Sequence, residues 1–205
     1  MTLWFVNRGT GVVLVALLTM ATALGVLSTT RLSRPLWPRW ATQRVHRNVS
    51  LLAVLVLLLH AGAAVADEFV DLRWYHVLVP IGGEYVAKER TALVLSALAF
   101  DAMVLVVVTS LLRDRLPLKM WRGVHLLAYL AWALGLLHGL LIGTDAKASW
   151  TIAVYVISLA VVLVAVAARL FTLRAEQRGG TAAVDDLVRW PAGSATRTTR
   201  TGRRR

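Results

Sequence analysis

Five long apolar runs, separated by short polar segments, make up most of the chain. They cover residues 10–28, 46–66, 91–112, 121–142 and 150–170. Each approaches the ~20 residues that a helix needs to cross the hydrocarbon core of a bilayer. Trp121 opens the fourth run and Trp150 opens the fifth, and tryptophan at such positions is typical of a membrane–water interface. The pattern predicts an all-α integral membrane bundle of five transmembrane helices.

Composition supports this interpretation and excludes an ordinary soluble domain. The 205-residue chain is 58% hydrophobic with a mean hydropathy of +0.65, whereas soluble domains contain about 45–50% apolar residues. The first apolar run resembles a signal peptide only in being apolar, because its basic residues follow it rather than precede it. We therefore expect a retained helix.

The charged residues of the loops predict the orientation of the helices. Residues 28–47 carry five arginines and no acid, and residues 113–122 carry four basic side chains and one acid. Residues 67–90 carry five acids and three basic side chains. Because cytoplasmic loops are enriched in Lys and Arg, this loop belongs outside, which places the N-terminus outside and the C-terminus inside. The same rule accounts for the net charge of +12 without a nucleic acid partner.

Three regions follow from this topology: a short outer N-terminus over residues 1–9, a transmembrane domain over 10–172 and a basic cytoplasmic tail over 173–205. The tail is rich in Arg, Gly, Thr and Ala, so we expect disorder. Its charge could attract anionic lipid or an acidic partner, or simply be solvated. The outer loop is aromatic around His76, which predicts a short interfacial or re-entrant element. His76 is a surface residue there, or a site for a metal ion or an electron acceptor.

Four of the five histidines lie on two of the predicted helices. His46 and His60 are 14 positions apart, about 21 Å along a helix, and His125 and His138 are 13 apart, about 19.5 Å. Because one span separates the two helices, they run in the same direction. His46 is then level with His125 on the inner side, and His60 with His138 on the outer side.

Such histidine pairs inside a membrane favour a cofactor site, since ionisable residues within spans are costly and usually functional. The chain has no Cys, which excludes disulfides, thiolate metal sites and covalently attached haem. Two imidazoles at each level can supply both axial ligands of a b-type haem. Glycines near the ligands would admit the macrocycle: Gly62, Gly123, Gly135 and Gly139. The alternative is four structural histidines, capping helices or hydrogen-bonded within the bundle.

Helical geometry fits one pair of spacings better than the other. Fourteen residues return to within about 40° of the starting direction, so His46 and His60 share a face. Thirteen residues leave about 140° between His125 and His138. The fourth helix therefore requires a tilt, a local irregularity or different haem orientations, although no proline lies between these two residues.

Several segments together resemble the ferric reductase-like transmembrane domain, which also occurs in NADPH oxidases and related bacterial haem proteins. They are the helix from His46 to His60, VLVPIGGEY, SLLRDRL and WRGVHLLAYLAWALGLLHGLLIGTD. The resemblance covers about residues 10–170 and implies that His46, His60, His125 and His138 bind two b-type haems. Larger members have six spans, where five are predicted here. Nothing after residue 170 resembles a flavin or nicotinamide domain, so their NADPH-fed activity is not carried over.

Other polar residues are candidates for supporting roles. Three arginines near the inner pair could neutralise haem propionates, or could be ordinary positive-inside charge: Arg44, Arg47 and Arg122. Asp101, in the third span, could carry protons or bond to a neighbouring helix. Trp132, between His125 and His138 in sequence, could bridge the haems or pack in the bundle.

The sequence thus predicts a plasma-membrane, di-haem electron-transfer protein that forms an oxidoreductase component without a flavin domain of its own. Its donor is expected to be a separate flavoprotein or quinol, and its acceptor ferric iron, oxygen, quinone or a redox protein. One alternative is a membrane-anchoring cytochrome b subunit that exchanges electrons with quinone. Another is a transporter or scaffold without redox function.

Overall fold

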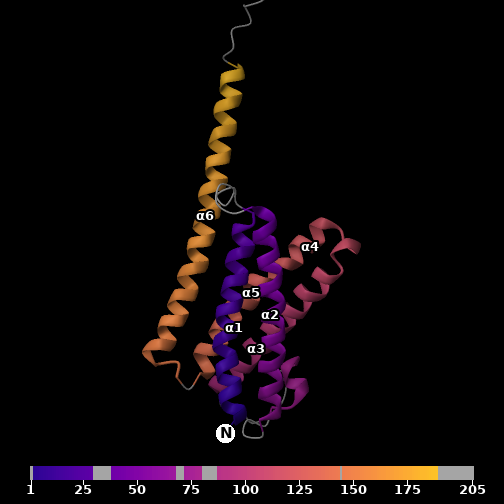
Figure 1. Cartoon of the computed structure of the whole chain (residues 1–205), viewed down its shortest axis with the longest axis vertical. Helices are drawn as coiled ribbons and strands as arrows, with labels where there is room; N and C mark the ends of the chain where they lie inside the picture. The colour runs from indigo at the N-terminus through magenta and orange to yellow at the C-terminus, as the bar shows by residue number, and fades with distance from the viewer. Residues whose placement is uncertain (1, 30–37, 68–71, 80–86, 144, 189–205) are drawn as a thin grey trace, which may run out of the picture.

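The computed structural model describes residues 2–29, 38–67, 72–79, 87–143 and 145–188. Helices account for most of this part of the chain, and none of it forms a strand. Two short 3₁₀ helices, η1 (Trp74–Val77) and η2 (Arg113–Arg115), accompany the α-helices. The α-helices are α1 (Thr2–Leu27), α2 (Arg39–Ala66), α3 (Ala87–Leu111), α4 (Leu118–His125), α5 (Leu127–Ile142) and α6 (Ser149–Val188) (Figure 1).

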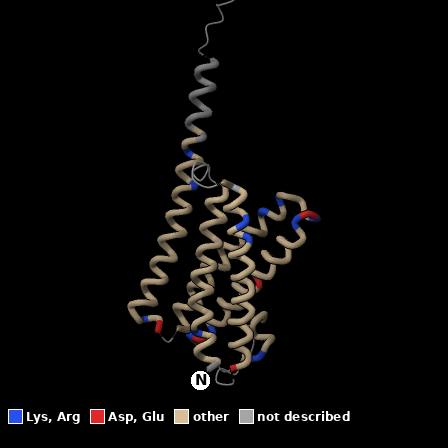
Figure 2. The backbone as a smooth tube through the Cα atoms, in the orientation of Figure 1, with Lys and Arg blue, Asp and Glu red and all other residues tan. Residues whose placement is uncertain are grey.

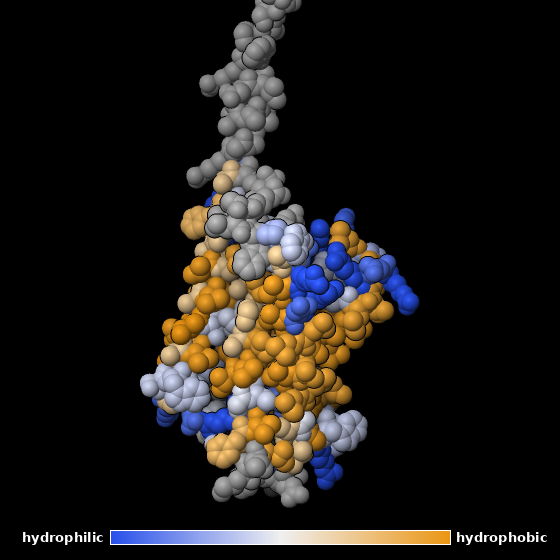
Figure 3. Space-filling view, in the orientation of Figure 1, coloured by the Kyte–Doolittle hydropathy of each residue, from blue (hydrophilic) through white to orange (hydrophobic). Residues whose placement is uncertain are grey.

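Five stretches of the described chain are long and apolar enough to cross a membrane, which confirms the predicted all-α class. They are Leu3–Leu27, Trp40–Ala66, Lys88–Leu111, Leu118–Ile142 and Ser149–Ala175. Helices α4 and α5 together form the fourth. Large apolar side chains are exposed on the bundle, among them Leu55, Leu58 and Val164, and the visible face is mainly apolar between its two polar ends (Figure 3). Such a surface requires a lipid environment.

The helices form two groups that meet at α1. Helix α1 packs along α2, and α3 packs along α5 and contacts α4. Helix α1 also packs against α5 and α6 (Figure 1). Within the described residues, α2 forms no extended interface with α4 or α5. The helices that carry the four histidines therefore belong to different groups.

Small residues allow these close helix contacts. Leu14 and Leu17 of α1 pack around Ala53 of α2. Towards the other end of α1, Val26 packs with Ala165 of α6. Alanine at such positions brings two backbones close together, as is common in membrane bundles.

Helical structure extends past both ends of the predicted transmembrane domain. Helix α1 begins at Thr2, so residues 2–9 are the first turns of the helix and not a separate outer segment. Helix α6 continues to Val188, where the sequence predicted disorder from 173 onward. Leu, Arg, Ala, Glu and Gln in the segment LRAEQR are strong helix formers and extend the helix beyond its apolar part. Residues 189–205 of the predicted tail lie outside the described chain.

The fourth span is interrupted at Leu126, directly after His125. The amide of Leu126 donates to the Gly123 carbonyl at 3.3 Å, and the amide of Tyr129 donates to the Leu126 carbonyl at 3.1 Å. Both are 3₁₀ contacts, which turn each residue by about 120° instead of about 100°. This tightening is a local irregularity of the kind that the 13-residue spacing required.

Basic side chains gather at one end of the bundle (Figure 2). We call this the basic end, and its exposed members are Arg44, Arg47, Arg113, Arg115, Lys119 and Arg122. The only acid within η2 is Asp114. At the opposite end lies η1, the short helical element predicted for the outer loop. Helices α2 and α4–α5 both run from the basic end towards this opposite end (Figure 1).

Candidate functional site

The four histidines of α2, α4 and α5 lie at two levels along the bundle. At the basic end, the ring centroids of His46 and His125 lie 6.3 Å apart and the ring planes are inclined by 74°. Towards the opposite end, His60 and His138 are close enough to interact electrostatically. The two levels expected from the spacing are therefore present; we call them the inner pair and the outer pair.

Three of the four imidazoles are held by backbone carbonyls of the neighbouring helix. Nδ1–H of His46 donates to the Ala21 carbonyl at 2.9 Å, and Nδ1–H of His60 donates to the Asn7 carbonyl at 3.0 Å. Nδ1–H of His138 donates to the Ala92 carbonyl at 2.8 Å. A neutral imidazole that donates from Nδ1 presents its Nε2 lone pair as an acceptor. This is the usual arrangement around metal-bound histidine.

Two glycines on α1 make its carbonyls available to α2. In a helix, the carbonyl of residue i bonds to the amide of residue i+4, so the carbonyls of Asn7 and Ala21 lie beside Gly11 and Gly25. A Cβ on Gly11 would lie 3.2 Å from Cε1 of His60, and one on Gly25 would lie 3.4 Å from Cε1 of His46. The missing side chains therefore let each imidazole ring reach a carbonyl that also accepts the helical hydrogen bond.

These glycines were not identified as part of the site from the sequence, although a signal was present. Gly11 and Gly25 are 14 residues apart, as are His46 and His60. Because α1 and α2 run antiparallel, Gly11 meets His60 and Gly25 meets His46. Equal spacing on two adjacent apolar helices could have indicated two matched contacts.

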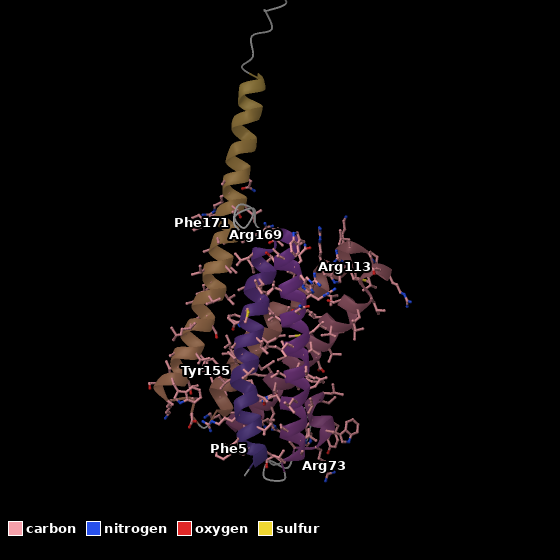
Figure 4. The ribbon with its side chains drawn as sticks, in the orientation of Figure 1. Phe5, Arg73, Arg113, Tyr155, Arg169 and Phe171 are labelled. Carbon is pink, nitrogen blue, oxygen red and sulfur yellow. The ribbon has the colours of Figure 1, made fainter. Side chains whose placement is uncertain are left out.

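His125 is held differently from the other three. Its Nδ1 lies 3.5 Å from Ser110 Oγ, at the long limit for a hydrogen bond. Its ring stacks on Trp121, with centroids 5.0 Å apart and planes inclined by 26°. The guanidinium carbon of Arg113 lies 4.7 Å from the centroid of the Trp121 ring, and its charge acts electrostatically on His125. Arg113 lies at the projecting end of α3–α4 (Figure 4).

The centroid separation of the inner pair is close to that of two imidazoles bound to one metal ion. An imidazole nitrogen lies about 2 Å from a bound metal ion and roughly 1.1 Å from its own ring centroid, so two trans rings have centroids about 6.2 Å apart. The distance between His46 and His125 is 6.3 Å. No group of three or more His, Cys, Asp or Glu that could hold a bare metal ion occurs among the described residues.

A Cβ on three of the four predicted glycines would meet open space, and two of them, Gly62 and Gly123, lie on exposed helix surface rather than between helices. Gly62, Gly123 and Gly135 have no atom within 4 Å of an added Cβ. Gly139 is different, because a Cβ there would collide with the hydroxyl of Tyr155 on α6 (Figure 4). The interpretation of Gly139 as room for a cofactor was wrong: this glycine admits a side chain of α6.

The predicted propionate partners lie exposed at the basic end. Arg44 and Arg47 flank His46 on α2, and Arg122 precedes His125 on α4. None of them shows a contact with the histidines in the described chain. Arg113, which was counted only as loop charge, is the arginine that acts on the inner pair.

Asp101 lies on the wrong face of α3 to serve the histidine pairs. Ala92, whose carbonyl holds His138, is nine residues away, about two and a half turns, so Asp101 faces the opposite direction. Its neighbours on that face are exposed apolar residues, with Leu98 at 50% and Leu105 at 51%. The proposed proton transfer near a haem is therefore not supported.

Trp132 and His76 are both buried. Trp132 is 8% exposed and donates from Nε1 to Thr19 Oγ1 of α1 at 3.0 Å, so it packs in the bundle at a depth between the two histidine pairs. His76 is 6% exposed, which corrects its interpretation as a surface residue. Its ring contacts Tyr75 at 4.4 Å between centroids, and its Nδ1 accepts from the Arg73 amide at 3.3 Å.

Comparison with known proteins places the chain in a family. One family model, described as a domain of unknown function (DUF8596), matches residues 2–145. The chain belongs to the DUF8596 family. The match runs from α1 past the end of α5 and includes all four histidines, whereas α6 lies outside it. No curated protein and no solved structure matches the chain.

Proposed function

We propose that this DUF8596 chain is a di-haem b-type electron-transfer protein of the membrane. His46 and His125 would ligate the inner haem, and His60 and His138 the outer haem. The observation that carries the proposal is the way three of these histidines are held, with Nδ1 donating to a backbone carbonyl and Nε2 left to bind iron. The ferric reductase-like resemblance of the segments around the histidines agrees with it.

The chain's own residues would orient the ligands and exclude water. The carbonyls of Asn7, Ala21 and Ala92 fix the tautomer and direction of three imidazoles before a cofactor binds, which favours ligation. When bound, haem supplies one-electron chemistry. Ligation by two histidines would leave the iron without an open position, which favours electron transfer over oxygen binding.

We place the chain in the plasma membrane, with the basic end and the C-terminus on the cytoplasmic side and the N-terminus on the outer side. Clustered Lys and Arg at this end support that assignment through the positive-inside rule. The inner pair then lies near the cytoplasm. Moving an electron outward across an inside-negative membrane lowers its free energy by about 2.3 kcal/mol per 100 mV, which favours outward transfer.

The electron donor would be a separate flavoprotein or quinol, and the acceptor ferric iron, oxygen, quinone or a redox protein. The exposed arginines and lysine of the basic end favour a soluble donor with an acidic surface. Reduction by such a flavoprotein would slow as salt rises, because salt screens exposed charges. Reduction by quinol alone, with no dependence on salt, would instead indicate a cytochrome b subunit.

The test is the ratio of haem to protein, with reduced-minus-oxidised spectra, for the purified chain and its variants. We expect about two haems per chain, each with the spectrum of a bis-histidine b-type haem. His60→Ala should lose the outer haem and His125→Ala the inner one, leaving about one in each. His76→Ala is the matched control, a buried histidine outside both pairs, and should keep two. A colourless wild type, or His60→Ala and His125→Ala variants with two haems, would contradict the proposal.

A further inference from the structure

His125 lacks the backbone anchor of the other three ligands. Within the described chain, its Nδ1 meets Ser110 Oγ at 3.5 Å, and a hydrogen bond of this length fixes a ring poorly. It is also the last residue of α4, directly before the break at Leu126. Something other than a carbonyl must therefore hold this imidazole in place.

Trp121 is the residue that contacts the His125 ring. It lies four residues before His125 on α4, on the same face of the helix. The two rings are nearly parallel, at 26°, with centroids 5.0 Å apart. Arg113 lies over the Trp121 ring at 4.7 Å from its centroid. The stack of Arg113, Trp121 and His125 leads from the basic end to the inner pair and restricts rotation of the His125 ring.

The indole N–H of Trp121 adds a second observation. Nε1 is buried, and within the described chain no hydrogen-bond acceptor lies in reach of it. Buried donors are nearly always paired, so an unpaired one indicates an acceptor that is not part of the protein. By contrast, the buried Nε1–H of Trp132 donates to Thr19. At the inner pair the missing acceptor would belong to whatever group binds there.

We infer that Trp121 is a positioning residue of the inner site, whose ring orients His125 and whose N–H donates to a carboxylate of the bound porphyrin. This inference rests on the proposed function. A b-type haem carries two propionates, and the basic end supplies the cationic surroundings that such carboxylates require. The outer pair needs no equivalent residue, because carbonyls hold both of its histidines.

The two contributions of Trp121 can be separated by substitution. Trp121→Phe keeps an aromatic ring on His125 but removes the N–H. The propionate then loses a donor and bears more negative charge, which stabilises ferric iron, so the reduction potential of the inner haem should fall. Trp121→Leu removes the stack as well. The His125 ring can then rotate away from the 74° angle with His46.

Redox titration and electron paramagnetic resonance of the ferric protein provide the readouts. The angle between axial imidazole planes sets the anisotropy of a low-spin ferric signal, so the inner haem should give a strongly anisotropic one. The inner signal is the one that disappears in His46→Ala. Trp121→Phe should lower its potential, and Trp121→Leu should change its anisotropy or lose the inner haem. The outer signal should stay unchanged in both.

Trp40→Phe is the matched control, since Trp40 lies at the same end on α2 and is 67% exposed. It should leave both haems and both potentials unchanged. An inner potential unaffected by Trp121→Phe would overturn the hydrogen bond, and an inner signal unaffected by Trp121→Leu would overturn the positioning role. Wild-type protein without haem would instead overturn the proposed function. The two failures are therefore distinguishable.

Discussion

A glycine four residues after a helical carbonyl turns that carbonyl into an acceptor for a side chain of the neighbouring helix. Helix α1 does this twice, at Gly11 and Gly25, and each time a histidine of α2 donates to the carbonyl. The hydrogen bond fixes which imidazole nitrogen remains available for ligation. Residues that never touch a cofactor can therefore decide whether the site binds one.

Under the proposed function, Gly11→Val should remove the outer haem although it changes no proposed ligand. Even a Cβ would lie 3.2 Å from His60 Cε1, so the larger side chain must displace the ring from the Asn7 carbonyl. We expect the haem-to-protein ratio to fall from about two to about one, with the outer signal lost.

Gly9→Val is the control for this substitution. Gly9 lies on the same helix, and no atom lies within 4 Å of a Cβ placed there, so two haems should remain. If the Gly11 variant binds as much haem as the Gly9 variant, the carbonyl–histidine bond does not organise the outer site.

At the residue scale, the sequence predicted the ligand candidates but not their supports. The spacing of His46, His60, His125 and His138 was sufficient to predict two levels, because depth in a membrane helix follows directly from residue number. The roles of Trp121 and Arg113 could not be predicted, since an interfacial tryptophan and a positive-inside arginine have the same sequence signature. The four-residue spacing of Trp121 and His125 could have indicated their contact on one helix face, whereas the position of Arg113 over the Trp121 ring depends on the fold.

Among the elements, the break between α4 and α5 matters most for the site. The sequence indicated that a regular helix would not aim His125 and His138 alike, yet it gave no position for the irregularity. No proline marks the break, although Gly123, whose carbonyl accepts from Leu126, is a weak helix former. Helix α3 contacts both sides of the break, through Ser110 at His125 and through Ala92 at His138.

Gly139 of α5 lies against the Tyr155 side chain of α6. Gly139→Ala should force the Tyr155 ring to move, at an overpacking cost of about 1–3 kcal/mol that the better helix propensity of alanine offsets by about 1 kcal/mol. Thermal melting in detergent measures the loss. The site itself should keep both haems, since neither pair includes α6.

Tyr155→Phe should restore much of this stability in the double variant, because it removes the colliding oxygen. Ser158→Ala, a substitution at another polar residue of α6 that is 4% exposed, serves as the control and should not rescue. Equal melting temperatures for Gly139→Ala with and without Tyr155→Phe would show that this contact does not limit packing.

The whole molecule is more predictable than its details. Five apolar runs of membrane-crossing length predicted an all-α bundle of membrane-spanning helices. The structure confirms this fold class. The limits of α1 and α6 were missed, because hydropathy locates the bilayer core and not the ends of helices that continue past it. Beyond the core, local helix propensity takes over, as in the segment that extends α6 to Val188.

The two groups of helices, α1–α2 and α3–α5, are joined by few direct contacts apart from those between α1 and α5. Each group contributes one histidine to each pair. Under the proposed function, iron would therefore bind across the divide twice, and haem would act as a cross-link between the halves. Ligand binding to the folded state adds stability, about 2.7 kcal/mol at a hundred times the dissociation constant.

The abundance of this protein should then follow the supply of haem in the cell. Without haem, the halves can separate, and a membrane chain that opens becomes a substrate for quality-control proteases. We expect pulse-chase labelling to show faster turnover in haem-starved cells, and the same fast turnover for the His60→Ala, His125→Ala double variant in replete cells. Equal lifetimes in all three conditions would mean that the halves hold together unaided. If lifetimes differ as expected, haem binding between α2 and α4–α5 controls how long the protein persists in the cell.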